Sequence, residues 1–508
     1  MSKLFTRSEI EKHNNEKSAW IIIDTVVYDI TKFAAMHPGG ELLILEHAGK
    51  DATEPFYAYH RQEVLTKYHR LKIGTIVNES PQIDFPEPGA FSKVPYAEPS
   101  ALQGFKSPYY TKSHHDFRKA VRTFLHTEVL PEALASDPSG GHPSKEIWKK
   151  MGDFGLLAAR MGPGPHLNGF TLPNNVKPSE FDYFYEQIIH EELITLTCPS
   201  YQDGLGAGMV IGLPPVMHFA KPAIHDRVVR EVLSGEKQIC LAITEPNAGS
   251  DVAAIKCTAK LTPDGKHYIV NGVKKWITNG TFCEYFTTAV VTDAGISMLL
   301  IERSEGLETK PIKTSYSSSA GTSYIILENV KVPAENLLGI DGAGFMVIMA
   351  NFNHERWFII AAIVFACRKI VEECFKWSNQ RIVFGKRLID QPVIRNKLAH
   401  MVAEVESVTN WLENMTYQFN SMTYKEANKR LAGPLALLKL ISTRVAHNVT
   451  DHAVQIFGGR AITQTGMGRC VELTQRTYKY AAILGGSEEI MADLGIRQAM
   501  RNFPNARL

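Results

Sequence analysis

Residues 243–251 read Ile-Thr-Glu-Pro-Asn-Ala-Gly-Ser-Asp and directly follow an apolar run, as a loop after a buried strand would. Two further stretches along the chain are similar in kind. Trp-Ile-Thr-Asn-Gly at 276–280 places an aromatic ring and a hydroxyl donor before a turn, and Gln-Ile-Phe-Gly-Gly-Arg at 455–460 offers bare backbone that could approach a phosphate. Each stretch alone is an ordinary turn more often than a site, so their order and spacing carry the information.

The segments around these stretches predict an α+β multidomain chain. Residues 111–235 have helical periodicity, residues 236–340 are rich in β-branched and aromatic residues with Asp-Gly and Asn-Gly turn signals, and residues 341–500 are helical again. Long helices are expected around 344–380, 390–420 and 430–456. Because no G-x-G-x-x-G motif follows a strand, a dinucleotide would not be held as in a doubly wound sheet.

A small unit, residues 1–78, precedes this large one, and six prolines between 79 and 110 predict an extended linker. Two strands paired through a short turn, a hairpin, are expected at 20–24 and 26–30. His37 stands before Pro-Gly-Gly, which projects its imidazole from a rigid loop, and His60 follows 23 residues later. Two imidazoles on opposing helices could hold a haem iron from both sides, which suits one-electron transfer.

The small unit resembles the cytochrome b5 haem-binding domain over residues 4–77. The resemblance rests on Trp20, Val-Tyr-Asp-Ile-Thr-Lys-Phe at 27–33, His-Pro-Gly-Gly at 37–40, Ala-Gly-Lys-Asp-Ala-Thr at 48–53, Phe56 and His60. It implies that His37 and His60 are the axial ligands of haem b.

The large unit resembles the acyl-CoA dehydrogenase family from about 115 to 500, through the three stretches above together with Arg-Ile-Val-Phe-Gly at 381–385 and Gly-Gly-Ser-Glu-Glu-Ile at 485–490. The resemblance implies a helical domain, a middle β-domain and a C-terminal four-helix bundle, with an acyl-CoA substrate. It also implies a homo-tetramer or homo-dimer that shares FAD sites. The residues implied to bind FAD are Thr244, Ser250, Trp276, Ile277, Thr278, Arg381, Phe384, Gln391, Gln455, Gly459, Ser487 and Glu489. Those from Arg381 to Gly459 would hold the adenosine and pyrophosphate of a neighbouring subunit's FAD, and Ser250 would lie near the flavin or the CoA pyrophosphate.

One departure from the family's pattern concerns the catalytic base. Most relatives carry a Glu at the position of Gly485, where this chain has no side chain. The long-chain and isovaleryl types carry the base in a Glu-Arg pair on a bundle helix, and Glu355-Arg356 occupies that position. The resemblance therefore implies Glu355 as the catalytic base, Arg356 as a substrate-binding residue and Glu488 as the fallback base.

Three functions are consistent with these features. The first is an FAD-dependent dehydrogenase that forms trans-2-enoyl-CoA and passes electrons to the fused haem or to an external acceptor. The second is an acyl-CoA oxidase-like enzyme that reduces oxygen to peroxide. The third is a non-enzymatic acyl-CoA- or haem-binding protein, which the loss at Gly485 would allow.

Composition limits the partners and the compartment. Lys+Arg is 55 and Asp+Glu is 53, so the net charge of +2 gives no case for nucleic acid. Seven cysteines without a C-x-x-C pair indicate reduced thiols in an intracellular protein. No stretch is long and apolar enough to span a membrane. The final residues Ala506-Arg507-Leu508, in a tail at 501–508, favour a peroxisomal address over a cytoplasmic location.

Overall fold

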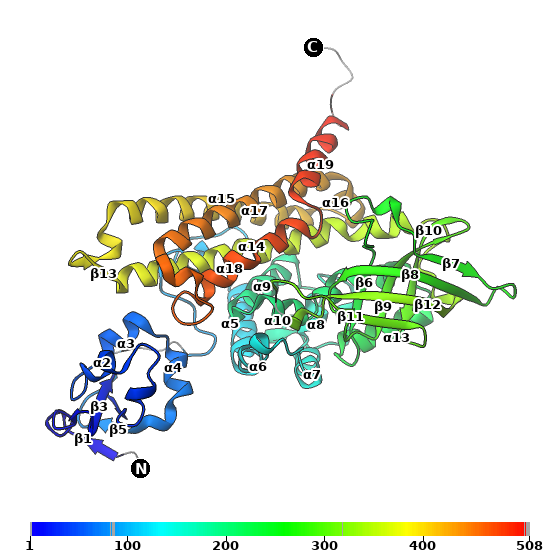
Figure 1. Ribbon diagram of the computed structural model, residues 1–508. Helices are drawn as coiled ribbons and strands as arrows, with labels where there is room; N and C mark the ends of the chain where they lie inside the picture. Colours follow the sequence, from blue (N-terminus) through cyan, green and yellow to red (C-terminus); the bar gives the residue numbers. More distant parts are fainter. Residues whose placement is uncertain (1–2, 82, 84–86, 317, 502, 504–508) are drawn as a thin grey trace. The chain divides into compact units, whose positions relative to one another are not determined.

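The computed structural model describes residues 3–81, 83, 87–316, 318–501 and 503. These residues form two compact units. Figure 1 shows the chain with its helices and strands labelled. Unit 1 comprises Met1–Glu87, Glu373–Leu398 and Ala453–Leu473, and unit 2 comprises Pro88–Glu372, Ala399–His452 and Thr474–Leu508. The predicted peroxisomal triplet Ala506-Arg507-Leu508 lies outside the described residues. Within them, no helix has the length and apolar character that crossing a membrane requires.

The N-terminal part of unit 1 is built on a mixed sheet in the order β1-β5-β4-β3-β2. Its strands are β1 (Lys3–Phe5), β2 (Asn14–Asn15), β3 (Ser18–Ile23), β4 (Val26–Asp29) and β5 (Lys72–Ile76), and its helices are α1 (Arg7–Ile10), α2 (Glu41–Leu45), α3 (Thr53–Tyr59) and α4 (Gln62–Lys67). The predicted hairpin is confirmed. Asp24 and Thr25, both at positive φ, make the two-residue turn that joins β3 to β4. Side chains alternate across the sheet along β3. Ile21 and Ile23 pack in one hydrophobic cluster, and Ile22 packs in a second cluster on the other face.

The helical first part of unit 2 and its β-domain follow in the predicted order. The helices are α5 (Lys112–Phe124), α6 (Leu130–Ser136), α7 (Lys145–Asp153), α8 (Leu156–Ala159), α9 (Tyr183–Leu193), α10 (Pro199–Gly204), α11 (Ala207–Gly212), α12 (Pro214–Phe219) and α13 (Pro222–Leu233). The strands are β6 (Ile239–Ala242), β7 (Thr258–Leu261), β8 (His267–Ile277), β9 (Tyr285–Thr292), β10 (Gly295–Glu302), β11 (Leu307–Pro311) and β12 (Ser323–Pro333). They form one sheet in the order β10-β9-β7-β8-β12-β11, with β6 added against β9.

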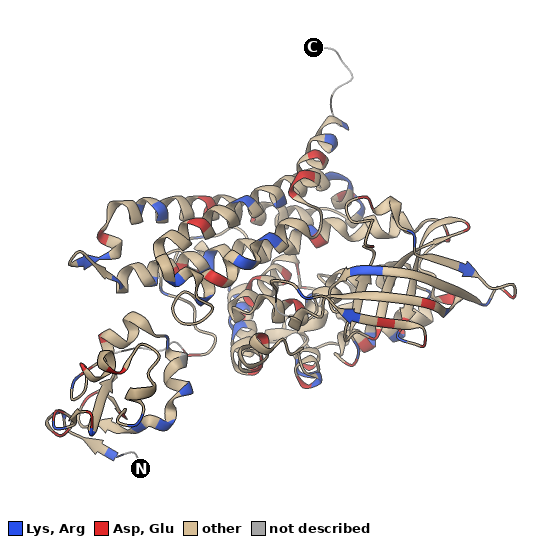
Figure 2. Cartoon of the chain, viewed as in Figure 1, with Lys and Arg blue, Asp and Glu red and all other residues tan. Residues whose placement is uncertain are grey.

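Long helices make up the C-terminal part, close to the predicted ranges. They are α14 (Gly344–Gln380), α15 (Pro392–Ser421), α16 (Tyr424–Arg430), α17 (Ala432–Phe457), α18 (Arg469–Ile483) and α19 (Glu488–Arg501), with a small hairpin of β13 (Ile382–Val383) and β14 (Lys386–Arg387) after α14. Contacts such as Trp357 Nε1 donating to Thr416 Oγ1 at 2.8 Å join α14 to α15. Acidic and basic residues are interspersed along the elements (Figure 2), and their numbers nearly balance.

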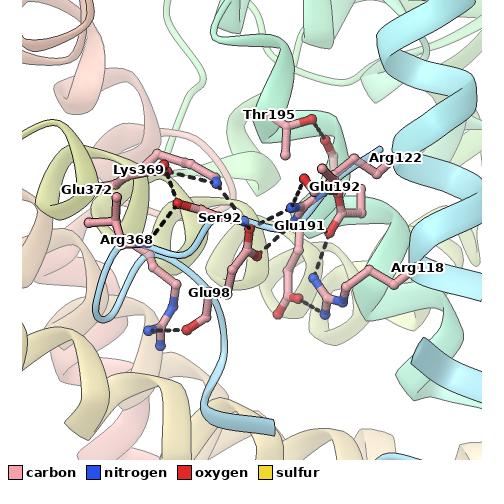
Figure 3. Close-up of polar contacts among 12 residues, drawn as sticks. Ser92, Glu98, Arg118, Arg122, Glu191, Glu192, Thr195, Arg368, Lys369 and Glu372 are labelled. Atoms are coloured by element: carbon pink, nitrogen blue, oxygen red, sulfur yellow. Dashed lines mark hydrogen bonds and ion pairs between the residues drawn. The ribbon is translucent and has the colours of Figure 1, made fainter. Parts of the chain in front are cut away.

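A buried charge network anchors part of the segment that was predicted as a linker. Arg122 donates to both oxygens of Glu98, at 2.5 and 2.9 Å, and to both oxygens of Glu192, at 2.6 and 2.8 Å (Figure 3). Arg118 pairs with Glu192 and Glu191, and Ser92 donates to Glu372 on α14. The stretch containing Ser92 and Glu98 is therefore held inside unit 2 and is not free chain.

We expect Arg122→Met to lower the free energy of unfolding by about 3 kcal/mol or more, because it leaves the carboxylates of Glu98 and Glu192 buried without their main counter-charge. Urea unfolding followed by tryptophan fluorescence would measure the loss. The matched control is Lys112→Met, which removes an exposed ion pair with Asp116 and should change the free energy by less than about 0.5 kcal/mol. Equal losses in the two variants would contradict a structural role for the network.

Candidate active site and haem site

Glu355 lies on α14 with its carboxyl group buried in unit 2. Its Oε2 has no hydrogen-bond partner among the residues that the structure describes. Burial raises the pKa of Glu355 to about 7, against the opposing effects of Arg356, Lys439 and His354. A carboxyl group with this pKa can take up and release a proton near neutral pH, as a general base must.

Gly485, the position emptied relative to the family's pattern, faces Glu355 directly. A Cβ atom at Gly485 would lie 3.7 Å from Glu355 Oε1, 3.6 Å from Cε of Lys439 and 2.8 Å from Cδ1 of Ile359. Gly485 also has φ +64°, in the region that favours glycine. The family's usual base position, Gly485, and the alternative position, Glu355, therefore lie side by side, and α14 supplies the carboxylate.

Two cations hold the turn that carries Gly485. Nε of Arg356 donates to the Gly485 carbonyl at 3.2 Å, and Nζ of Lys439 donates to the carbonyls of Gly486, at 2.7 Å, and Ala481, at 3.1 Å. Arg356, predicted to bind substrate, is therefore placed to position the turn opposite Glu355. Lys439 was not predicted as a site residue. The available sequence signal was a single lysine inside the apolar run 435–441. Burial, and to a smaller extent the charge of Arg356, lowers the pKa of Lys439 to about 8.

The residues implied to face the flavin ring come from β8 and the loop after β6. The Thr244 carbonyl accepts from the Lys275 amide at 2.8 Å, which ties that loop to β8. Trp276 has φ +66° and is 51% exposed, while the neighbouring Ile277 is buried. Thr278 Oγ1 lies 3.1 Å from the hydroxyl of Tyr480 on α18. An accessible indole beside a hydroxyl fits a planar cofactor with polar edges.

The other residues of unit 2 that the family resemblance implies to bind FAD, Ser250, Ser487 and Glu489, are more exposed than Glu355. Ser250 lies in the exposed part of the loop after β6. Ser487 Oγ accepts from the Ile490 amide at 3.4 Å, so it caps α19, and Glu489 is exposed in that helix's first turn. None of these three side chains contacts Glu355 among the interactions of the described residues.

The residues implied to bind adenosine and pyrophosphate gather in unit 1. Arg381 precedes the β13–β14 hairpin, whose Phe384 is 96% exposed, and Gln391 follows that hairpin before α15. Gln455 is exposed near the end of α17, and a Cβ on Gly459 would meet nothing within 4 Å. The open backbone at Gly459 and the guanidinium of Arg381 are both groups that can bind phosphate oxygens.

His37 and His60 face each other in unit 1. Their ring centroids are 5.9 Å apart with an interplanar angle of 12°, a separation that leaves room for one iron atom between facing nitrogens. Nδ1 of His37 lies 3.0 Å from the Gly40 carbonyl oxygen, which directs Nε2 inward. Burial and His37 lower the pKa of His60, which favours the neutral, ligating form. The two residues fit a haem.

One expectation about these histidines is wrong. His37 projects from a loop, as predicted, but the two residues do not lie on opposing helices: His37 follows the short 3-10 helix Ala34–Met36 and His60 follows α3, both with extended backbone. Pro-Gly-Gly after His37 and the end of α3 at His60 stop the helices there, so rigid loops present both rings.

Buried groups around Glu355 were also not predicted. Nε2 of His354, the residue before Glu355, lies 2.7 Å from Oε1 of Glu186 on α9. Tyr480 stacks on Tyr316 with a centroid distance of 4.7 Å, and the Tyr316 hydroxyl donates to Asp203 at 2.8 Å. Sequence alone gave no signal for these contacts, since each joins residues more than 100 positions apart.

Family models match the chain in four consecutive segments. Residues 6–77 match the cytochrome b5-like heme/steroid binding domain, and residues 111–236, 240–330 and 342–500 match the N-terminal, middle and C-terminal domains of acyl-CoA dehydrogenase.

Individual proteins give the same answer. The chain is 37% identical to acyl-CoA dehydrogenase apdG of Emericella nidulans over 81% of this chain and 96% of that protein, and 33% identical to acyl-CoA dehydrogenase AFT10-1 of Alternaria alternata over 81% and 97%. A Bacillus anthracis acyl-CoA dehydrogenase solved in complex with FAD is 26% identical, with a TM-score of 0.68 over 78% of this chain and 69% of that one. The chain is a member of the acyl-CoA dehydrogenase family that carries an N-terminal cytochrome b5-like domain.

Proposed function

We propose that the protein oxidises an acyl-CoA to the trans-2-enoyl-CoA, with Glu355 as the base that removes the α-proton. The observation that supports this most is the buried Glu355 carboxyl, whose Oε2 has no partner and which faces Gly485. FAD, which the family implies, accepts the β-hydrogen as hydride when bound. Arg356 and Lys439 hold the turn opposite Glu355, so the reacting carbons would be fixed between that turn and α14.

The test is an anaerobic titration with a panel of acyl-CoA thioesters, recorded from the flavin band to the haem Soret band. Bleaching of the flavin absorbance with formation of enoyl-CoA would support the proposal. A spectrum that stays unchanged with every acyl-CoA would contradict it and favour the non-enzymatic binding function.

The rate constant of flavin reduction should rise with pH through about 7. The pKa of Glu355 is raised to about 7, and only the ionised carboxylate can accept the α-proton. Below this pKa the rate should fall about tenfold per pH unit, and above it the rate should be constant. Stopped-flow absorbance at 450 nm between about pH 5 and 9 would show the step. Glu355→Asp keeps a carboxylate and should keep a pH step at a lower rate, whereas a flat profile in the wild-type protein would contradict the base assignment.

We further propose that the electrons pass to haem b held by His37 and His60. The facing imidazoles support this, because two axial ligands leave the iron free only for electron transfer. Reduced-haem bands that appear after flavin bleaching, without oxygen, would support it. Oxygen consumption with stoichiometric peroxide and an unchanged haem would instead favour the oxidase function, and bleaching alone would point to an external acceptor.

A homo-dimer or homo-tetramer is part of the same proposal. Phe384 and Ile382 are apolar, lie on the β13–β14 hairpin and are 96% and 49% exposed, which is typical of side chains that a partner covers. Sedimentation velocity would give the assembly, and a monomer with full FAD content would contradict shared sites.

A further inference from the structure

Arg160 differs from three other buried arginines of unit 2. Arg118, Arg122 and Arg368 each pair with one or more carboxylates. Arg160 is 2% exposed, at the end of α8, and donates through Nη1 to the Leu205 carbonyl, but its Nε has no partner and it forms no ion pair among the described residues. Burial lowers its pKa to about 10. Because a buried guanidinium without a counter-charge and with an unsatisfied Nε is costly, its retention indicates a ligand.

A second unsatisfied group, an acceptor, lies close to Arg160. Glu186 is fully buried, and its Oε1 lies 2.7 Å from His354 Nε2 and 3.3 Å from His190 Nε2. Within the described part of the chain, its Oε2 has no hydrogen-bond partner. The backbone of Gly162, two residues after Arg160, lies next to that oxygen, since a Cβ there would be 2.6 Å from it. A donor and an acceptor are thus both left unsatisfied in one buried region.

This region adjoins the proposed base. His354, which binds Glu186, immediately precedes Glu355 on α14. On the other side, Tyr480 is buried, and the charges of Asp203 and Glu355 both raise its pKa. Asp203 is in turn an acidic neighbour of Arg160. Polar groups from α8, α9, α10, α14 and α18 therefore form a chain of neighbours that reaches Glu355 within unit 2.

We propose that the acyl chain carries an oxygen substituent away from the thioester, which accepts a hydrogen bond from Nε of Arg160. A hydroxyl would in addition donate to Oε2 of Glu186, and a carboxylate would pair with the guanidinium. A plain hydrocarbon would leave both groups desolvated and unpaired, which disfavours it. This inference rests on the proposed function, because it concerns the substrate of the same site.

The experiment compares kcat/KM for flavin reduction by three series of acyl-CoA thioesters over a range of chain lengths: unsubstituted, ω-hydroxy and ω-carboxy. At the best length we expect an oxygenated chain to exceed the unsubstituted chain by about tenfold or more, and the better series identifies the substituent. Arg160→Met should bring the ratio close to one. Arg230→Met, a change on the exposed face of α13, should leave the ratio unchanged.

Binding supplies a readout that does not depend on turnover. The oxygenated acyl-CoA should raise the Tm of the protein more than its unsubstituted analogue, and Arg160→Met should remove the difference. If Arg160→Met does not fold, Arg160→Lys keeps a charge but lacks Nε and should still reduce the ratio. Unsubstituted chains that react and bind as well as both oxygenated series would overturn the inference while leaving the dehydrogenase proposal intact, and would indicate that water satisfies both groups. Failure of every acyl-CoA to reduce the flavin would contradict the proposed function, and the Tm comparison would still decide the inference.

Discussion

Glu355→Gln should lower the rate constant of flavin reduction by about 1,000-fold or more while acyl-CoA still binds. The amide has nearly the shape of the carboxyl but cannot accept the α-proton. Because Gly485 offers no side chain, no second carboxylate stands at the family's usual position to replace it. Stopped-flow absorbance would give the rate, and the perturbation of the flavin spectrum by acyl-CoA would show binding.

The control for this variant is Glu488→Gln, at the fallback base. Glu488 begins α19 and its carboxylate lies 3.6 Å from Arg444. Its loss should change the rate little, because the structure does not place it against Gly485. A normal rate in Glu355→Gln together with a lost rate in Glu488→Gln would reverse the assignment.

Stability offers an independent check on Glu355→Gln. The folded-state pKa of about 7 lies above the ordinary value of 4.5, so ionising Glu355 above pH 7 costs the folded state up to about 3 kcal/mol. The contribution of Glu355 therefore lowers the free energy of unfolding of the wild-type protein progressively as the pH rises from about 4.5 to 7. The variant should gain stability relative to wild type at pH 8 and much less at pH 5, which would also show that it folds.

The parts of the fold that sequence predicted are those set by local pattern. The β3–β4 hairpin follows from Ile21, Ile22 and Ile23 before a two-residue turn, and α14, α15 and α17 follow from long helical periodicity. The Glu355–Gly485 juxtaposition was implied only through the family resemblance. These two residues are 130 positions apart in the sequence, and no periodicity relates them.

What sequence did not predict depends on long-range packing. Glu98 lies in a proline-rich stretch that was predicted as linker, yet it is buried because Arg122 and Lys369 supply counter-charges from α5 and α14. Glu186 and His354, likewise, belong to helices whose faces meet only in the folded chain. A carboxylate's burial is decided by the partner it meets, and that partner is not visible in local sequence.

The haem ligands can be separated from the flavin chemistry. His37→Ala and His60→Ala should each abolish the Soret band of bound haem b, because one imidazole alone cannot hold the six-coordinate iron. His69→Ala is the matched control, since His69 is exposed and should not be needed for haem. Absorbance spectra and a pyridine-haemochrome assay would measure haem content. Full haem in His37→Ala would contradict the ligand assignment.

The same variants decide how far the two sites depend on each other. Glu355 and the turn that carries Gly485 belong to unit 2, whereas His37 and His60 belong to unit 1. If the haem is not needed for flavin binding or for proton removal by Glu355, His37→Ala should reduce its flavin with acyl-CoA at the wild-type rate and lose only the later step to haem. Re-oxidation of the flavin would then need oxygen or an added acceptor. In anaerobic stopped-flow without an acceptor, the rate of flavin re-oxidation should fall to zero. A His37→Ala protein that cannot reduce its flavin would show instead that the haem-binding domain supports the structure or cofactor loading of the dehydrogenase.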